Sequence, residues 1–150
     1  RQAKVILWRG HCSVHGRFSL NNITEVRSRL AGVKVLVHPE CQHEVVKNAD
    51  VVGSTEMIIK TVTDSAAGSI WAIGTELNLV QRLAQNNLDK QIVFLDKTVC
   101  YCSTMNRIDL PHLVWALESL VRGEVVNQIK VDPETKQFAK TALDQMLALP

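Results

Sequence analysis

Residues 33–40 read Val-Lys-Val-Leu-Val-His-Pro-Glu, and this stretch decides the fold. Its first five residues are β-branched or apolar apart from one lysine, which is typical of a short buried strand. The polar triplet His38-Pro39-Glu40 ends that strand, and a helical pattern follows over residues 40–48. A strand, a polar turn and a helix in this order form the repeating unit of α/β proteins.

The same alternation recurs on both sides of this stretch. Apolar, β-branched runs predict further strands, and helical patterns lie between them. The predicted strands are 4–8, 33–37, 50–52, 69–73 and 91–95, and the predicted helices are 22–30, 40–48, 55–64 and 75–86. Because crossover helices join parallel strands, the chain is predicted to belong to the α/β class.

The pattern changes after residue 102. Apolar residues on one helical face predict a helix that begins at Asp109 and ends at Gly123. A short strand is predicted over residues 127–131, and Asp132 is the expected N-cap of a second amphipathic helix.

Composition and charge exclude several classes of protein. Hydrophobic residues make up 46% of the chain and charged residues 21%, which is ordinary for a globular domain and excludes disorder. The net charge of +2 comes from scattered basic residues, so no nucleic-acid partner is indicated. The apolar runs stay well under the roughly 18 residues of a spanning helix, so no membrane partner is expected either. We therefore expect a cytoplasmic protein and, because the chain enters a strand without an initial methionine, a piece of a longer one.

Four cysteines are the first candidates for metal chemistry, namely Cys12, Cys41, Cys100 and Cys102. In the cytoplasm thiols stay reduced, so metal ligands or small buried hydrophobic residues are expected rather than disulfides. Cys12 follows the first predicted strand and Cys102 follows the last, 90 residues later, a plausible length for one repeated α/β unit. Ligand sites gather at the carboxyl ends of such strands, which favours these two cysteines.

Two kinds of metal site fit these cysteines. Cys12 and His15 together with Cys100 and Cys102 would make a zinc site of the Cys₃His type, although neither segment contains a Cys-x-x-Cys knuckle. An iron–sulfur cluster takes thiolates from distant loops. Cys102 lies closer than Cys100 to the following helical segment, which favours its thiolate and ranks it first.

The polar triplet His38-Pro39-Glu40 has a catalytic and a structural interpretation. Proline fixes φ and holds the imidazole and the carboxylate at a set separation, so that the pair can bind and move protons. Alternatively, Glu40 only complements the first turn of the following helix, and His38 is a satisfied residue at the strand end.

Residues 53–55, Gly-Ser-Thr, also have two interpretations. Glycine, two hydroxyls and the amides at a helix start would hold a phosphate or a carboxylate. Alternatively, Ser54 or Thr55 is an ordinary N-cap. The similar run Gly74-Thr75-Glu76 is predicted to be a helix cap.

Several linked motifs resemble the quinolinate synthase family. Residues 7–15, Leu-Trp-Arg-Gly-His-Cys-Ser-Val-His, are similar to its segment around the second cluster cysteine. Residues 36–40 and 52–55 resemble its two substrate segments, and residues 102–112 and 129–132 resemble its C-terminal portion. The resemblance covers almost the whole chain in the family's order and spacing.

The resemblance implies an enzyme that condenses iminoaspartate with dihydroxyacetone phosphate to give quinolinate, a step of NAD biosynthesis. An aspartate oxidase or dehydrogenase would supply the iminoaspartate. The resemblance also implies a [4Fe–4S] cluster on three cysteines, whose open iron acts as a Lewis acid on substrate oxygens. The alternatives are a non-catalytic α/β module that binds an anionic metabolite and a zinc-stabilised domain.

Carried over residue by residue, the resemblance assigns metal-binding, catalytic and substrate-binding roles. The assigned residues are Cys12 and Cys102 as cluster ligands, His38 and Glu40 as catalytic residues, and His38, Pro39, Glu40, Ser54 and Thr55 as substrate-binding residues. His15 is expected to face the same cavity, and Cys41 is expected to be a structural thiol.

The family's fold implies three similar α/β units around a pseudo-threefold axis, each with short parallel sheets in three layers and one cluster cysteine. Residues 1–15 would end the second unit, residues 16–102 would form the third, and residues 103–150 would add C-terminal helices and a short strand. The first unit and the third cysteine would lie before Arg1, so the chain alone is not expected to sustain turnover.

Overall fold

The computed structural model describes residue 4, residues 9–98 and residues 102–149. The chain divides into two compact units, Arg1–Asn106 and Arg107–Pro150. Within the described residues, none of the helices combines the length and the apolar character needed to cross a membrane.

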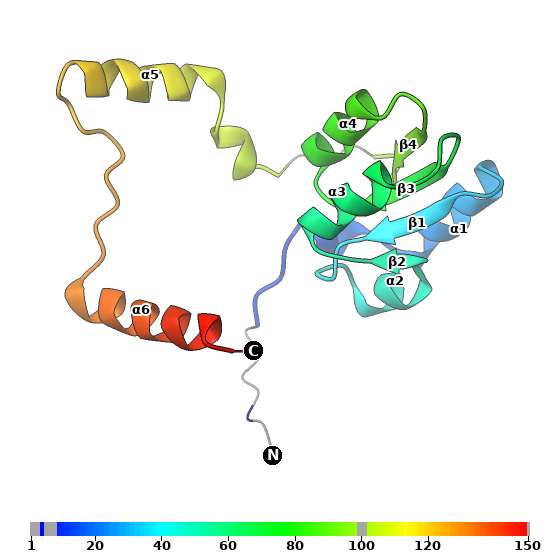
Figure 1. Cartoon of the computed structure of the whole chain (residues 1–150), viewed down its shortest axis with the longest axis horizontal. Helices are drawn as coiled ribbons and strands as arrows, with labels where there is room; N and C mark the ends of the chain where they lie inside the picture. Colours follow the sequence, from blue (N-terminus) through cyan, green and yellow to red (C-terminus); the bar gives the residue numbers. More distant parts are fainter. Residues whose placement is uncertain (1–3, 5–8, 99–101, 150) are drawn as a thin grey trace. The chain divides into compact units, whose positions relative to one another are not determined.

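The first unit is built on a parallel sheet of four strands in the order β2-β1-β3-β4 (Figure 1). The strands are β1 (Lys34–Val37), β2 (Val51–Val52), β3 (Ile70–Gly74) and β4 (Gln91–Phe94). They confirm the predicted α/β class and four of the predicted strands within one or two residues. The strand predicted over residues 4–8 lies, apart from residue 4, outside the described residues.

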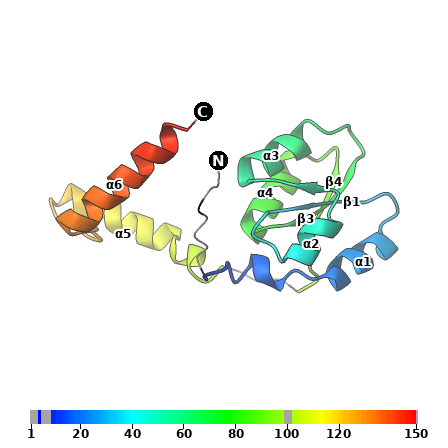
Figure 2. The ribbon, with the colours of Figure 1, turned by 90° about the horizontal axis from the view of Figure 1, so that it is seen from below.

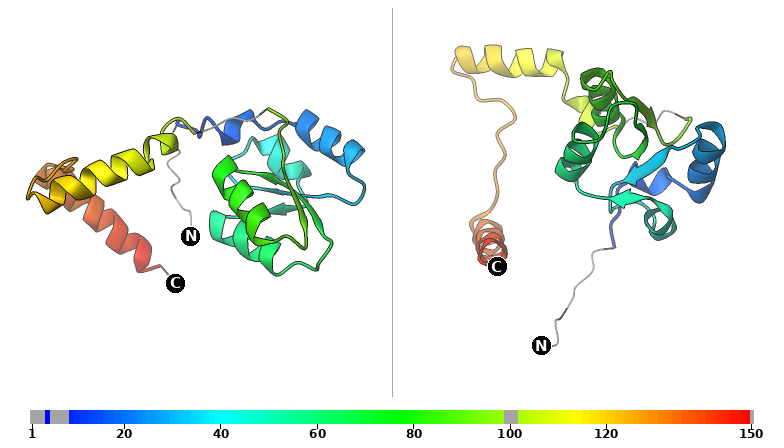
Figure 3. Two further views of the ribbon diagram at one scale, coloured as in Figure 1. Left: turned by 90° about the horizontal axis from the view of Figure 1, so that it is seen from above. Right: turned by 45° about the vertical axis from the view of Figure 1, so that its right-hand side comes forward.

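Helices cover both faces of the sheet and make three layers (Figures 2 and 3). Helices α1 (Leu20–Arg29) and α2 (His43–Asn48) lie on one face, and α3 (Thr55–Thr63) and α4 (Leu77–Asn86) lie on the other. The alternation of side chains along β1 explains the arrangement, because Val35 and Val37 point into one cluster and Leu36 into the other.

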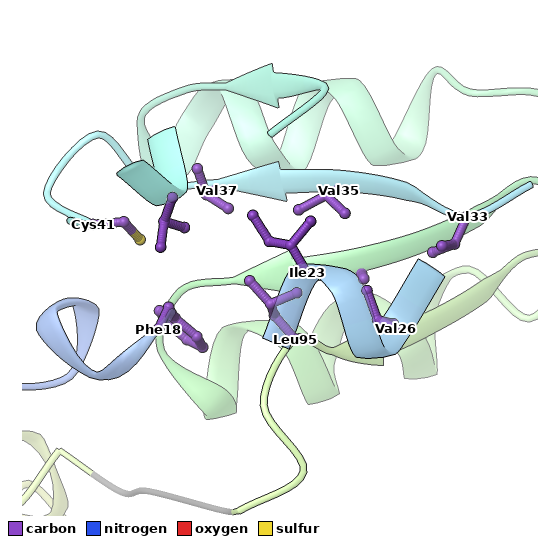
Figure 4. Close-up of a cluster of buried hydrophobic side chains, with 10 residues drawn as sticks. Phe18, Ile23, Val26, Val33, Val35, Val37, Cys41 and Leu95 are labelled. Atoms are coloured by element: carbon purple, nitrogen blue, oxygen red, sulfur yellow. The ribbon is translucent and has the colours of Figure 1, made fainter. Parts of the chain in front are cut away.

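Each face of the sheet has its own apolar core. In the core under α1 and α2, Phe18 and Ile23 pack against the valines of β1 and against Leu95 (Figure 4). In the core under α3 and α4, Ile58 packs with Ile73. Both isoleucines are fully buried, so the sheet is dry on both faces, as parallel sheets require.

Local hydrogen bonds explain where the helices begin. Helix α1 starts two residues earlier than predicted, because the side chains of Ser19 and Asn22 form a capping box. Helix α2 starts at His43 instead of residue 40, because the Cys41 amide donates to the His38 carbonyl and closes a turn first. Helix α4 follows the expected cap, in which the Glu76 carboxylate accepts from the Leu79 amide.

The second unit contains the two helices predicted for it, α5 (Leu110–Val121) and α6 (Pro133–Leu147). Their N-caps are Asp109 and Asp132, as expected. The strand predicted over residues 127–131 is wrong, because these described residues form no strand. Asn127 has a φ of 56°, which interrupts an extended backbone, and the described part of this unit offers no neighbouring strand to pair with.

The strand order places a topological switch point between β1 and β3. The connection from β1 leads to β2 on one side, whereas the connection from β3 leads to β4 on the other. In open α/β sheets the crevice outside the carboxyl ends of two such strands is the usual ligand site. Gly74 ends β3 there, and a Cβ at this position would lie 3.0 Å from both Val37 Cγ1 and Leu95 Cδ2, so this end of the sheet is tightly packed.

Asp50 fixes the edge of the sheet just before β2. Its Oδ2 accepts the buried Val35 amide at 2.6 Å, and Arg27 donates to both carboxylate oxygens at 3.0 Å. Burial acts to raise the pKa of Asp50, but the hydrogen bonds from Val35 and Arg27 outweigh it and lower the pKa. The ionised carboxylate is therefore the form that stabilises the fold.

We expect Asp50→Ala to lower the free energy of unfolding of the chain by about 1–3 kcal/mol, because the Val35 amide loses its acceptor. Asp50→Asn, which keeps an acceptor but loses the charge, should cost less. Because folding lowers the Asp50 pKa, the ionic contribution is fully present above the unfolded value of about 3.9 and disappears as the pH falls through the folded value. Urea titrations near pH 7 and pH 3 measure the free energy of unfolding of both proteins. If wild type and Asp50→Asn lose the same free energy of unfolding between pH 7 and pH 3, the prediction is contradicted.

Candidate functional site

Three polar segments meet at the carboxyl edge of the sheet. The His38 amide donates to the Gly74 carbonyl, and the Gly53 amide donates to the Val37 carbonyl, both at 3.1 Å. These bonds extend the alignment of the strands into the loops that follow them. Three segments therefore begin side by side at the same edge of the sheet, namely 38–40, 53–55 and 74–76.

His15 links the two loops at the switch point. It lies in a short 3₁₀ helix (His15–Arg17), and only 11% of its side chain is exposed. Its Nδ1 donates to Glu40 Oε2 at 3.0 Å, in the loop after β1. Its Nε2 lies 3.2 Å from the hydroxyl of Thr75, which follows β3. His15 thus contacts Glu40 directly, and its expected role in a shared cavity stays a prediction.

His38 stacks on His15, with ring centroids 4.5 Å apart and planes inclined by 12°. Burial first and the neighbouring His15 second lower the pKa of His38, and Glu40 only partly offsets them. The lowered pKa favours the neutral ring. Because His38 Nδ1 accepts the Glu40 amide at 3.3 Å, the proton of that ring lies on Nε2, where it is available to a ligand.

Glu40 and Cys12 border a cleft of about 460 Å³, together with Gly10 and His11. The Glu40 side chain is 58% exposed, so its second oxygen is free to meet a ligand. The ligand atoms of Cys12, His15 and Glu40 all lie within 4.8 Å of one another. The three side chains are a candidate metal-binding group of mixed sulfur, nitrogen and oxygen donors.

A second cleft of about 430 Å³ lies between the ends of α3 and α4. Its lining is His15, Thr55, Thr75, Glu76, Asn78, Leu79, Arg82 and Met105. Thr55 is the first residue of α3, where the helix dipole and free amides favour an anion. The Ser54 hydroxyl accepts the Met57 amide at 3.4 Å, so Ser54 is the N-cap and Thr55 faces the cleft.

The described cysteines differ in reactivity. Hydrogen bonds from the Thr104 hydroxyl, 3.2 Å from the sulfur, and from the Met105 amide lower the pKa of Cys102. Burial raises the pKa of Cys41 to about 11, and its sulfur donates to the Gly74 carbonyl. Cys41 is thus a packed thiol, as expected. Cys100 lies outside the described residues, so the choice between it and Cys102 stays a prediction.

Several residues of the second cleft are not predicted from the sequence to belong to the site, Thr75 and Arg82 among them. The sequence predicts Thr75 only as part of a helix cap, yet its buried hydroxyl lies against His15 Nε2 and orients the ring. Arg82 lies on α4 one helical turn and a half from its start and lines the second cleft. Thr75 could have been found, because a polar residue directly after a buried strand is a signal of a site. Arg82 could not, because a single basic residue on an amphipathic helix does not indicate a site.

Comparisons with known proteins point to one family. A family model described as quinolinate synthetase A protein matches residues 1–148. The quinolinate synthase of Streptomyces coelicolor is 70% identical over 152 residues, covering 100% of this chain and 39% of that protein. Quinolinate synthases of Nocardioides sp. and Anoxybacillus flavithermus are 69% and 55% identical, and the chain covers 38% and 40% of their lengths. The chain therefore spans about two fifths of these relatives.

Alkylation should separate two of the three described thiols, Cys41 and Cys102. Because the lowered pKa of Cys102 favours its thiolate, we expect iodoacetamide to modify it at a lower pH than an ordinary cysteine, whereas Cys41 stays protonated up to about pH 11. Peptide mass spectrometry of the metal-free chain across a pH series measures both rates. In concentrated urea the two rates should converge. Equal rates in the folded chain would show that the two environments are not as described.

Proposed function

The chain belongs to the quinolinate synthase family, and from this premise we propose that it supplies two cluster cysteines and one wall of the substrate site of such an enzyme. The complete protein would condense iminoaspartate, supplied by an aspartate oxidase or dehydrogenase, with dihydroxyacetone phosphate to form quinolinate in the cytoplasm. The observation that carries the proposal is the convergence of Cys12, His15 and Glu40 beside His38 at the switch point.

The donor chemistry fits an iron–sulfur cluster. Cys12 opens onto the 460 Å³ cleft, and the pKa of the partly exposed Cys102 is lowered, so both thiols suit the role of thiolate ligand. Cys41 is buried and its raised pKa opposes that role. In the proposed enzyme Cys12 and Cys102 hold a [4Fe–4S] cluster with a third cysteine from outside this chain. When bound, the cluster supplies an open iron that polarises substrate oxygens.

His38 and Glu40 are the proposed catalytic pair. The neutral His38 ring directs its Nε2 proton away from the Glu40 amide and donates it to a substrate oxygen. Glu40 accepts a proton from substrate carbon or returns it to a leaving oxygen, as general acid–base chemistry requires. His15 holds one Glu40 oxygen at 3.0 Å and leaves the other to the substrate, while Pro39 sets the separation of the pair.

Thr55 is the proposed anchor for a carboxylate or phosphate of the substrates. It begins α3 and lines the second cleft, where Arg82 adds a positive charge. Ser54 supports the anchor by capping the helix. Gly53 gives the backbone room here, since a Cβ at that position would come within 2.7 Å of the Met57 side chain.

The architecture of the proposed enzyme is pseudo-threefold. Residues 1–15 would end the second α/β unit, residues 16–102 would form the third, and residues 103–150 would form the C-terminal elements. The remaining unit would lie in the part of the relatives that this chain does not span. The chain is thus proposed to hold part of a shared site and to need that unit for turnover.

Cys102→Ser in the complete enzyme should abolish the cluster, because a thiolate ligand is lost. Anaerobic reconstitution with iron and sulfide measures this as loss of the broad visible absorbance of iron–sulfur charge transfer. Cys41→Ser is the matched control and should keep the absorbance, since Cys41 is buried and its raised pKa opposes a ligand role. If Cys102→Ser keeps the cluster and Cys100→Ser loses it, the ligand is Cys100 instead of Cys102. No absorbance in wild type would remove the iron–sulfur assignment.

Glu40→Gln in the complete enzyme should keep the cluster and lower kcat about 10²–10⁴-fold, the usual contribution of a positioned acid or base. The amide preserves the size of the side chain and removes its proton chemistry. Glu44→Gln, an exposed carboxylate in the first turn of α2, is the control and should leave kcat unchanged. If Glu40→Gln keeps the wild-type kcat, Glu40 is not an acid or base and only binds the substrate.

A further inference from the structure

The Cys12–His15–Glu40 group has the dimensions of a single-ion site. Its three ligand atoms lie within 4.8 Å of one another. Around a tetrahedral zinc ion with ligand bonds of about 2.0–2.3 Å, neighbouring ligand atoms lie about 3–4 Å apart. The Glu40 side chain is 58% exposed, so it has room to turn toward an ion. A cluster is not required for these three donors to act together.

We propose that Cys12, His15 and Glu40 bind one Zn²⁺ ion when the cluster is absent, and that this ion competes with cluster assembly for Cys12. One thiolate, one imidazole and one carboxylate with a fourth position open to water form the ligand set of an open zinc site. The inference shares Cys12, His15 and Glu40 with the proposed function but does not depend on it, because it needs only the three side chains and their support.

Thr75 supplies the orienting contact that such a site needs. A metal-bound histidine almost always donates its other ring N–H to an oxygen, which fixes the tautomer and the ring orientation. His15 Nε2 lies 3.2 Å from Thr75 Oγ1, and the Thr75 residue is only 2% exposed. A hydroxyl can donate or accept, so Thr75 Oγ1 accepts a hydrogen bond from Nε2–H when Nδ1 turns to the ion.

The proton balance of binding is simple. The Cys12 thiol gives up its proton to solvent. The neutral His15 ring only changes tautomer, because it loses the Nδ1 proton that now faces Glu40 Oε2 and takes one up on Nε2. Glu40 exchanges that hydrogen bond for the ion. Zinc binding therefore releases one proton, from the thiol, and strengthens as the pH rises, as for other thiolate sites.

The surroundings of His15 make the site preorganised and open on one side. The ring is held by the stacked His38 at 4.5 Å and by Thr75, so little freedom is lost when it binds. Cys12 and Glu40 border the 460 Å³ cleft, which admits the ion and leaves room for a water ligand.

Cobalt titration of the complete, cluster-free enzyme under anaerobic conditions tests the proposal. Co²⁺ reports its own ligands, and we expect one ion per chain with a thiolate-to-cobalt charge-transfer band and the visible bands of tetrahedral cobalt, both removed by added Zn²⁺. Thr75→Val should weaken binding about 10–100-fold, and Thr75→Ser should restore it. His15→Ala should weaken it at least about 100-fold.

Two further variants separate this site from the cluster. Cys102→Ser should lose the cluster and keep cobalt binding, whereas His15→Ala should keep the cluster and lose cobalt binding. Zn²⁺ added before reconstitution should slow cluster formation in wild type and not in His15→Ala. Unchanged cobalt affinity in His15→Ala, or cobalt bands without a thiolate contribution, would overturn the proposal. A wild type that binds cobalt but forms no cluster would support this site while removing the iron–sulfur assignment.

Discussion

Backbone hydrogen bonds hold Val37 of β1 level with Val52 of β2 and Gly74 of β3. Because parallel strands end at the same edge, the loop that follows each strand begins at the same height. His15 then needs only one position to contact the loops after β1 and β3. The geometry of the site therefore depends on strand register. The register fixes where each loop begins, and the loops then supply the side chains.

The sequence predicts the local features of this frame well. Apolar runs bounded by polar residues indicate the strands around Val35 and Trp71, and they place polar groups after each strand. Contacts between distant segments could not be predicted this way. The bonds of His15 reach across 25 and 60 residues, and neither separation has a sequence signature. The strand expected over 127–131 fails for the same reason, because apolar alternation says nothing about whether a partner strand is present.

The described cysteines show how a fold assigns different roles to one kind of side chain. Cys41 directly follows Glu40 in sequence, but it turns into the core and donates to the Gly74 carbonyl. Cys12 borders a cleft, and Cys102 lies among donors that stabilise its thiolate. Burial and hydrogen bonding, rather than spacing along the chain, thus divide structural thiols from reactive ones.

Gly74 has an evolutionary consequence. A Cβ there would come within 3.0 Å of both Val37 and Leu95, so three positions on or next to three different strands share one small volume. A larger residue at any of them requires a smaller one at another. Across related sequences these three positions should covary. The covariation would indicate tight packing at this edge of the sheet even where the surrounding side chains have diverged.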